Sequence, residues 1–275
     1  MRSDRADERL VTELLNARDT ATITGLPSQR EVGLGLDNGY RIGRALHERL
    51  LERGHQAAGR KIGFTNPVTW REFDLNTPVW APMYAHTVHF ADQGSHGLAL
   101  SGMVAPRIEP EVVLKLRRLL PNGDLLPEEV APCLEWAALG FEIVDSHYPD
   151  WRFTAADAVA DFGFHAALVV GTPWYLEPDD ALTVATCLQM LTVSLRRGSE
   201  IVARGEGRNA LGSPLLALGH LARVLAAQPY VPPLIPGEVI ATGTLTLPPY
   251  VSSADSWRME VVGAPMRPLE ITVGN

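Results

Sequence analysis

The chain has 275 residues, with 24 Lys and Arg against 32 Asp and Glu, and it carries a formal net charge of −8 at pH 7. Its 46% hydrophobic and 20% charged residues are close to the averages of soluble globular proteins, and its length suits one large domain or two small ones. The negative charge repels nucleic-acid phosphates and anionic lipids, so no nucleic acid and no membrane is expected as a partner. The charged segment 1–9 lacks the apolar core of a signal peptide, and no apolar run reaches the ~18 residues that cross a bilayer. These features predict a cytoplasmic protein.

The first third of the chain has a helical pattern. Apolar residues recur at helical spacing over 10–15, and a second helix is expected to start at Asp37 as its N-cap and to stop before Gly54. From about Arg60 the pattern changes to short β-branched runs separated by Pro, Gly and Asn. These runs predict strands at Val112–Leu116, Phe141–Val144, Ala167–Val170, Leu191–Leu195, Val239–Thr242 and Leu269–Val273.

Two further helical segments interrupt the predicted strands. One follows Pro127 and includes the apolar segment Val130–Ala138, and the other runs from about Ser213 to about Ala227. Strands outnumber helices and do not alternate strictly with them, which predicts an α+β fold with a large strand-rich core rather than a doubly wound parallel sheet. We expect an N-terminal helical region over 1–59 and a core over 60–275 that forms a single structural unit.

A pair of glutamates in the predicted strand around 107–116 carries a functional signal. Alternate residues of a strand face the same side about 7 Å apart, so Glu109 and Glu111 present two carboxylates on one face, while their neighbours are apolar. Two like charges on a buried face are costly unless a partner such as a divalent cation neutralises them. Pro110 cannot donate to a ladder and predicts an edge strand or a bulge. The alternative is that both glutamates lie on a solvated edge.

A third acid, Glu142, lies in the middle of the apolar strand-like run 139–144. A glutamate in such a run is rarely left without a partner. Three carboxylates without a nearby cluster of Lys or Arg, and without His or Cys at ligand spacing, favour a hard, oxygen-preferring ion such as Mg²⁺ or Mn²⁺. The alternative for Glu142 is an ion pair with an arginine such as Arg152.

Seven short segments follow one another along the chain in a recognisable order. They are Lys61–Thr65, Ile108–Glu111, Leu134–Trp136 with Glu142, Asp150–Trp151, Ala160–Asp161, Leu211–Pro214 and Gly237–Leu245. In this order the chain resembles the 2-oxopent-4-enoate hydratase and 4-oxalocrotonate decarboxylase group of the fumarylacetoacetate hydrolase superfamily, over nearly its whole length. The resemblance implies a mixed β-sandwich roll with an N-terminal helical region. It also implies a homo-oligomeric enzyme (a dimer or higher) of aromatic catabolism.

Carried over residue by residue, the resemblance implies a metal site and a substrate site. It makes Glu109, Glu111 and Glu142 the ligands of Mg²⁺ or Mn²⁺, and it makes Lys61 the active-site lysine. The residues implied to hold the substrate carboxylate are Ile62, Gly63, Thr242, Gly243 and Thr244. A 2-oxo acid offers two oxygens as a chelate, and the metal stabilises the enolate formed when a proton or a carboxyl group leaves. Lys61 is expected to bind the carboxylate or to shuttle a proton, and the alternative is a solvated basic residue beside Arg60.

The chain departs from the family's pattern at polar positions. Val79 stands where members carry an acid, and Phe162 follows Asp161 where an Asn is usual. Candidates for the catalytic base are therefore His147, His165 and Asp161. The departures leave the predicted metal site intact and suit a divergent subgroup.

The sequence therefore predicts a metal-dependent lyase that hydrates a 2-hydroxypenta-2,4-dienoate-like substrate to a 4-hydroxy-2-oxo acid. The alternative is vinylogous decarboxylation of a 2-oxo-3-enedioate such as 4-oxalocrotonate, which an additional Arg or Lys facing the substrate would favour. A divergent member acting on another β-dicarbonyl or 2-oxo acid is also open. Hydrolysis of a C–C bond would need a His–carboxylate pair that activates water, and a non-enzymatic binding protein would show lost metal affinity.

Overall fold

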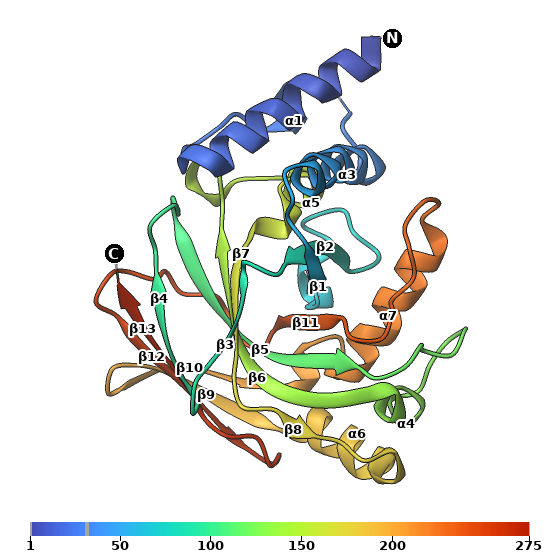
Figure 1. Cartoon of the computed structure of the whole chain (residues 1–275), viewed down its shortest axis with the longest axis vertical. Helices are drawn as coiled ribbons and strands as arrows, with labels where there is room; N and C mark the ends of the chain where they lie inside the picture. The colour runs from blue at the N-terminus through green and yellow to red at the C-terminus, as the bar shows by residue number, and fades with distance from the viewer. Residues whose placement is uncertain (1, 31–32, 275) are drawn as a thin grey trace.

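The computed structural model describes residues 2–30 and 33–274 (Figure 1). Its helices are α1 (Arg2–Thr20), α2 (Pro27–Arg30), α3 (Leu36–Glu52), α4 (Pro127–Val130), α5 (Ala155–Ala160), α6 (Ala181–Met190) and α7 (Pro214–Ala227). Its strands are β1 (Ala57–Gly63), β2 (Val79–Tyr84), β3 (Val88–Phe90), β4 (Ser95–Ala99), β5 (Pro106–Leu116), β6 (Leu134–Asp145), β7 (His165–Val170), β8 (Trp174–Tyr175), β9 (Thr192–Arg197), β10 (Glu200–Glu206), β11 (Val239–Thr244), β12 (Ser256–Val262) and β13 (Leu269–Gly274). The combination of helices with mostly antiparallel sheets confirms the predicted α+β class.

Two sheets organise the molecule. The larger runs in the order β2-β1-β11-β5-β6-β7-β3, with β8 beside β6, and the smaller in the order β10-β9-β12-β13-β4. One apolar cluster joins Ile108 and Val112 of β5 to Leu218 of α7 and Trp257 of β12, so the main core lies between the sheets and under α7. The even-numbered face of β5 is therefore buried in the core, and the odd-numbered face carries Glu109 and Glu111.

Helix α7 belongs to this core. The segment Gly207–Ala227 has the length and hydropathy of a membrane-spanning helix, but 56% of that window is buried inside the protein. Its leucines fill the main apolar cluster together with both sheets. This is the placement of a core helix, and burial inside the protein accounts for the apolar composition of the segment.

The N-terminal helices pack over the other side of the larger sheet. Leu14 of α1 and Ile42 of α3 share a cluster with Tyr148 and Phe162, and in Figure 1 α1 and α3 lie at the end opposite α4 and α6. Helix α5 packs against α3 through this cluster. The helical region thus covers the segment that carries Asp161. The predicted division into 1–59 and 60–275 stays a prediction.

The structure corrects two of the predicted helices. The helix predicted to include Val130–Ala138 is wrong over most of its length, because α4 ends at Val130, a single 3-10 turn covers Ala131–Cys133, and β6 begins at Leu134. Pro132 lacks the N–H that a longer helix needs, and pairing with β5 fixes the following residues as a strand. Helix α3 begins at Leu36 with Gly35 as its N-cap, so Asp37 lies within its first turn and is not the cap.

The predicted edge position of Pro110 is also wrong. Strand β5 lies between β11 and β6 in the interior of the larger sheet, and Pro110 is buried opposite Phe141. The irregularity occurs in the neighbouring strand, where the register of β11 against β5 shifts between Ala241 and Thr244. This shift lies beside Glu111, so an irregular backbone does adjoin the glutamates, although on the partner strand.

Candidate metal centre

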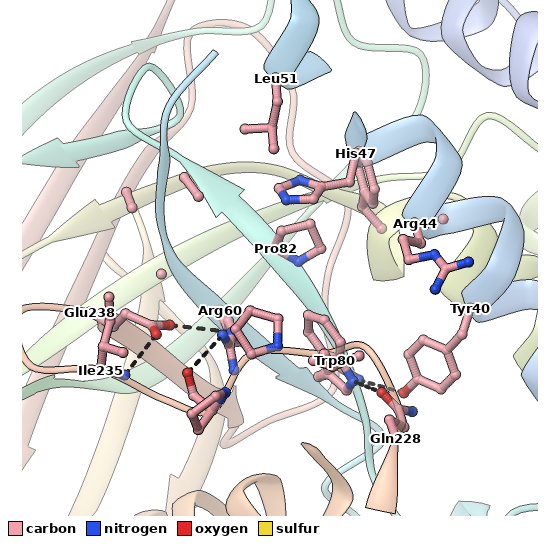
Figure 2. Close-up of a pocket in the computed structure, with 18 of the residues that line it drawn as sticks. Tyr40, Arg44, His47, Leu51, Arg60, Trp80, Pro82, Gln228, Ile235 and Glu238 are labelled. Atoms are coloured by element: carbon pink, nitrogen blue, oxygen red, sulfur yellow. Dashed lines mark hydrogen bonds and ion pairs between the residues drawn. The ribbon is translucent and has the colours of Figure 1, made fainter. Parts of the chain in front are cut away.

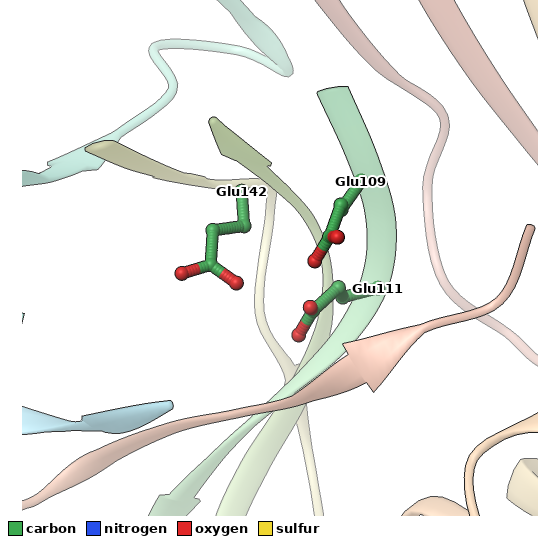
Figure 3. Close-up of side chains that lie close together, drawn as sticks. All are labelled: Glu109, Glu111 and Glu142. Atoms are coloured by element: carbon green, nitrogen blue, oxygen red, sulfur yellow. The ribbon is translucent and has the colours of Figure 1, made fainter. Parts of the chain in front are cut away.

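The three glutamates meet at the junction of β5 and β6. Register places Glu109 directly opposite Glu142, with Glu111 two residues further along β5. One carboxylate oxygen from each lies within 4.8 Å of those of the other two, and Figure 3 shows the three side chains turned toward one another. Glu111 and Glu142 are fully buried, whereas Glu109 is half-buried.

The carboxylates are short of partners. Oε2 of Glu111 accepts a hydrogen bond from the Gly243 N–H at 2.8 Å, but its buried Oε1 has no partner among the described residues. Burial and the charges of Glu142 and Glu109 raise the pKa of Glu111 well above its ordinary value, and burial raises the pKa of Glu109 to about 7. An orphaned buried oxygen within a ring of carboxylates is what a divalent cation would satisfy, so these residues fit a hard metal ion.

Lys61 completes the buried charge cluster. Its Nζ lies 2.9 Å from Oε2 of Glu142 and donates a hydrogen bond to the Gly163 carbonyl at 3.0 Å. Burial lowers the pKa of Lys61, but the three glutamates more than offset this and leave the pKa above its ordinary value. Burial likewise raises the pKa of Glu142, and Lys61 with His165 more than offsets that and leaves it lowered. Lys61 is therefore a protonated ammonium held against the triad.

His165 holds the other oxygen of Glu142. Its Nδ1 lies 2.8 Å from Oε1 of Glu142, and its Nε2 lies 2.8 Å from the Thr87 hydroxyl. Burial lowers the pKa of His165, so the neutral ring donates its Nδ1–H to the carboxylate. Glu142 is thus positioned from both sides, as metal-binding carboxylates commonly are.

The backbone around the centre adopts conformations that most residues avoid. Gly243 has φ +99°, and a Cβ there would lie 2.1 Å from Oγ1 of Thr65. Only glycine therefore lets this N–H reach Glu111. Phe162, Gly163 and Phe164 follow one another with positive φ, and this turn aims the Gly163 carbonyl at Lys61. Strain of this kind concentrates at functional sites.

Asp161 and His147 form a separate buried group. Oδ2 of Asp161 lies 2.8 Å from Nδ1 of His147, and its Oδ1 accepts a hydrogen bond from Arg18 of α1 at 2.8 Å. A second nitrogen of Arg18 donates to the His165 carbonyl at 2.8 Å. The pKa of Asp161 is raised by burial, but His147 and Arg18 more than offset this and leave it lowered. The structure therefore places this pair behind His165 and brings neither residue into the triad.

The residues predicted to hold the substrate carboxylate have mixed positions. Ile62 is buried in the main core, and Gly63 is half-buried at the end of β1. The Thr242 hydroxyl donates to the Val112 carbonyl at 2.7 Å, and the Thr244 hydroxyl donates to the Thr246 carbonyl at 2.9 Å. Both threonine side chains are thus committed to backbone, and Gly243 is the member of this segment that contacts a glutamate.

Three alternatives from the sequence are overturned by the geometry. Glu111 is fully buried, so the two glutamates of β5 do not lie on a solvated edge. Glu142 pairs with Lys61 and His165, and the proposed partner Arg152 is exposed. Lys61 is 3% exposed and is not a solvated neighbour of Arg60.

Sequence reasoning missed three contributors to the centre. Arg18, Thr87 and the Gly163 carbonyl come from α1, from the turn between β2 and β3, and from the turn after α5. None follows a local pattern with its partner, because the contacts join residues 78 to 147 positions apart. Of the three, only the Gly163 carbonyl has a signal in the sequence, since the glycine of the unusual Asp161-Phe162-Gly163-Phe164 segment marks a turn.

Two cavities flank the centre without containing the triad. The larger, of about 1370 Å³, lies between α3, β1, β2 and the segment after α7 (Figure 2). Arg60 lines it and pairs with Glu238 at 3.3 Å, while the adjacent Lys61 points to the triad, so β1 separates this cavity from the centre. The smaller, of about 470 Å³, is lined by His147 and His165 and adjoins the centre through the latter.

The raised pKa of Glu109 makes a pH-dependent metal effect testable. Because its pKa of about 7 in the folded protein exceeds the ordinary 4.5, its contribution favours folding below pH 4.5 and is lost as pH rises to about 7. Metal needs the ionised carboxylates, so Mg²⁺ at about 100 times its Kd should raise Tm by about 5–10 °C at pH 8. At pH 5 the shift should nearly vanish. Thermal melts with Mg²⁺ or EDTA at both pH values check this, and equal shifts would contradict ligation by these carboxylates.

Comparison with known proteins gives a consistent set of relatives. No family model matches the sequence. The chain is 30% identical over 257 residues to the 2-hydroxyhexa-2,4-dienoate hydratase of Comamonas testosteroni, covering 93% of this chain and 91% of that protein. It is 27% identical over 247 residues to a 4-oxalocrotonate decarboxylase of a Pseudomonas species, covering 90% and 87%.

Solved structures show the same architecture. The 4-oxalocrotonate decarboxylase from Pseudomonas putida G7, complexed with magnesium and adipate, superposes with a TM-score of 0.87 at 20% identity, covering 98% of this chain and 97% of that chain. Fumarylpyruvate hydrolase from Pseudomonas aeruginosa, in complex with Mn²⁺ and pyruvate, gives a TM-score of 0.55 at 15% identity, covering 78% and 88%. These likenesses confirm the predicted fold.

Proposed function

Because the chain belongs to the 2-keto-4-pentenoate hydratase and 4-oxalocrotonate decarboxylase group of the fumarylacetoacetate hydrolase family, we propose that it is a metal-dependent lyase that hydrates a 2-hydroxy-2,4-dienoate. The product is a 4-hydroxy-2-oxo acid, formed by addition of one water across the dienol. The observation that carries this proposal is the buried triad of Glu109, Glu111 and Glu142 with the ammonium of Lys61 against it.

The metal proposed for the centre is Mg²⁺ or Mn²⁺. The three carboxylates would hold it, since all-oxygen ligands suit these hard ions, and the partnerless Oε1 of Glu111 would gain a partner. When bound, the ion supplies Lewis-acid stabilisation of the negative charge that develops on a 2-oxo acid during the reaction. Magnesium and manganese in the neighbouring structures support this choice of ions.

Lys61 is the proposed proton donor and carboxylate partner. Its raised pKa keeps it charged at neutral pH, and its burial strengthens its attraction for an anionic substrate. The Gly163 carbonyl fixes the direction of the ammonium group. From this position Lys61 can donate a proton to the carbon chain as the dienol becomes a ketone.

The remaining site residues have supporting roles in this proposal. His165 positions Glu142 through its Nδ1–H, and Gly243 positions Glu111 through its N–H. Asp161 is hydrogen-bonded to His147 and to Arg18 of α1, and Arg18 in turn holds the His165 backbone. They act through His165, because their hydrogen-bonding groups face one another rather than the triad.

Decarboxylation of a 2-oxo-3-enedioate is the second candidate. It breaks the bond between the distal carboxylate and the carbon chain, releases CO₂ and leaves the same type of dienol. One observation favours it, namely that the positively charged Arg107 lies two residues before Glu109 on the same face of β5. We further propose that the protein acts in the cytoplasm as a homo-oligomer, which rests on the resemblance to its family.

A spectrophotometric panel separates these reactions. With Mg²⁺ present, we expect 2-hydroxydienoates to lose their dienol absorbance in the presence of the protein without release of CO₂. Release of CO₂ from 2-oxo-3-enedioates with accumulation of the dienol would favour decarboxylation instead. Failure to turn over either class with Mg²⁺ or Mn²⁺ would contradict the proposed function.

A further inference from the structure

Arg107 lies beside the triad on β5, and its own contacts bear on which substrates the centre could take. It lies on β5 opposite Val144 and faces the same side of the sheet as Glu109. The positive charge of Arg107 acts on Glu109: it lowers the pKa of that carboxyl, although the larger effect of burial leaves the pKa raised. A cation other than Lys61 therefore lies beside the candidate metal centre.

Two aromatic rings clamp the guanidinium of Arg107. Its Cζ lies 4.4 Å from the ring centre of Trp151 and 4.3 Å from that of Tyr250, and Nη2 donates to the Tyr250 hydroxyl at 2.9 Å. Trp151 is held in turn by its indole N–H, which donates to the Ala105 carbonyl, and by contact with Phe164. The two rings leave the N–H edge of the guanidinium as the side from which it can donate hydrogen bonds, and they hold the group in one orientation.

Arg107 has no anionic partner among the residues that the structure describes. No ion pair joins it to any carboxylate in the described part of the chain, and its buried Nε has no hydrogen-bond acceptor there. The two other arginines buried near the centre differ, since Arg18 pairs with Asp161 and Arg60 with Glu238. A buried N–H without an acceptor on a clamped, half-buried cation indicates a missing anionic partner.

Burial decreases from the triad toward Arg107 and Tyr250. Glu142 and Glu111 are fully buried, Glu109 and Arg107 are half-buried, and Tyr250 is 55% exposed. A substrate whose inner end lay at the glutamates would therefore have Arg107 toward its solvent end. Two residues along a strand span about 7 Å, which matches an extended carbon chain of about five or six atoms with C–C bonds of about 1.5 Å.

We propose that Arg107, clamped between Trp151 and Tyr250, is a specificity-determining residue that binds a second carboxylate at the end of the substrate away from the glutamates. This inference rests on the proposed function, because it takes the 2-oxo acid end of the substrate to lie at the triad. It names the substrate class as dicarboxylic for either reaction. A planar guanidinium suits a carboxylate because it can donate two parallel N–H bonds.

Two inhibitors of equal chain length test the proposal. 2-Oxohexanedioate and 2-oxohexanoate differ only in the distal carboxylate, and calorimetry measures the binding of each to the Mg²⁺-loaded full chain. We expect the wild-type protein to bind 2-oxohexanedioate about 10-fold or more tightly than 2-oxohexanoate. A charge-assisted hydrogen bond to the distal carboxylate contributes an affinity gain of this size. Arg107→Met should remove this preference while leaving the affinities for 2-oxohexanoate and oxalate unchanged.

Matched variants make the result specific. Arg107→Lys keeps the charge without the planar fork and should retain part of the preference, whereas Arg204→Met, which removes an exposed arginine of β10, should retain all of it. Equal binding of the two acids by the wild-type protein, or equal weakening of both by Arg107→Met, would overturn the role of Arg107 and leave the proposed function standing. Absence of metal-dependent binding of oxalate and of both 2-oxo acids would instead overturn the proposed function and this inference with it.

Discussion

Replacing Glu142 by glutamine is expected to abolish tight metal binding and to lower kcat/KM by about 10³-fold or more, the scale of several kcal/mol of charge stabilisation. Glu142 is fully buried and joins the triad to both Lys61 and His165. The amide keeps the shape of the side chain but loses the charge that a divalent ion requires. Calorimetry for the metal and steady-state kinetics for the reaction measure the two effects.

A glutamate on the same strand provides the control. Glu135 lies on β6, pairs with Lys115 at 3.2 Å and has a side chain that is 36% exposed. Exposed pairs contribute about 0–1 kcal/mol, so Glu135→Gln should leave metal affinity and rate within about twofold. A folded Glu142→Gln protein that takes up Mg²⁺ like the wild type would show that the metal does not use this carboxylate.

Replacing Lys61 by methionine should lower kcat without weakening metal binding. The ammonium is buried against the triad, and loss of a positioned proton donor typically lowers kcat by about 10²–10⁴-fold. Metal affinity should be retained or increased, because the substitution removes a cation that competes for Glu142. The split between kcat and metal affinity distinguishes a catalytic ammonium from a merely structural one.

The chain supplies one matched control for this variant. Lys115 is the only other lysine, and its ion pair with Glu135 is partly exposed. Lys115→Met should leave kcat unchanged. Wild-type kcat in Lys61→Met, or a concurrent loss of metal binding by that variant, would contradict the assigned role.

Much of the fold was predictable because the strands carry local patterns. The apolar runs at 112–116, 141–144 and 239–242 all lie in strands of the larger sheet, where both faces are covered. The helix predicted after Pro127 failed because the same apolar pattern serves a buried strand, and pairing with β5 decided between the two. The edge prediction for Pro110 failed because the irregular backbone was supplied by the partner strand β11.

The candidate site was predictable only where it is local. Alternation along β5 predicts that Glu109 and Glu111 share a face, and an apolar context singles out Glu142. Contacts between distant segments follow no local sequence pattern, and His165 is the clearest case. The sequence presents it as a candidate base, whereas the structure commits its two ring nitrogens to Glu142 and Thr87. The pairing of Asp161 with Arg18 of α1 is equally invisible in the sequence.

Glu109, Glu111 and Glu142 are expected to bind one divalent ion in each chain. Calorimetric titration of the metal-stripped, folded protein with Mg²⁺ and Mn²⁺, in the absence and presence of oxalate as a 2-oxo acid mimic, tests this directly. We expect one ion bound per chain, tighter binding with oxalate, and loss of uptake in Glu111→Gln. No uptake of either ion by the native protein, with or without oxalate, would contradict the account.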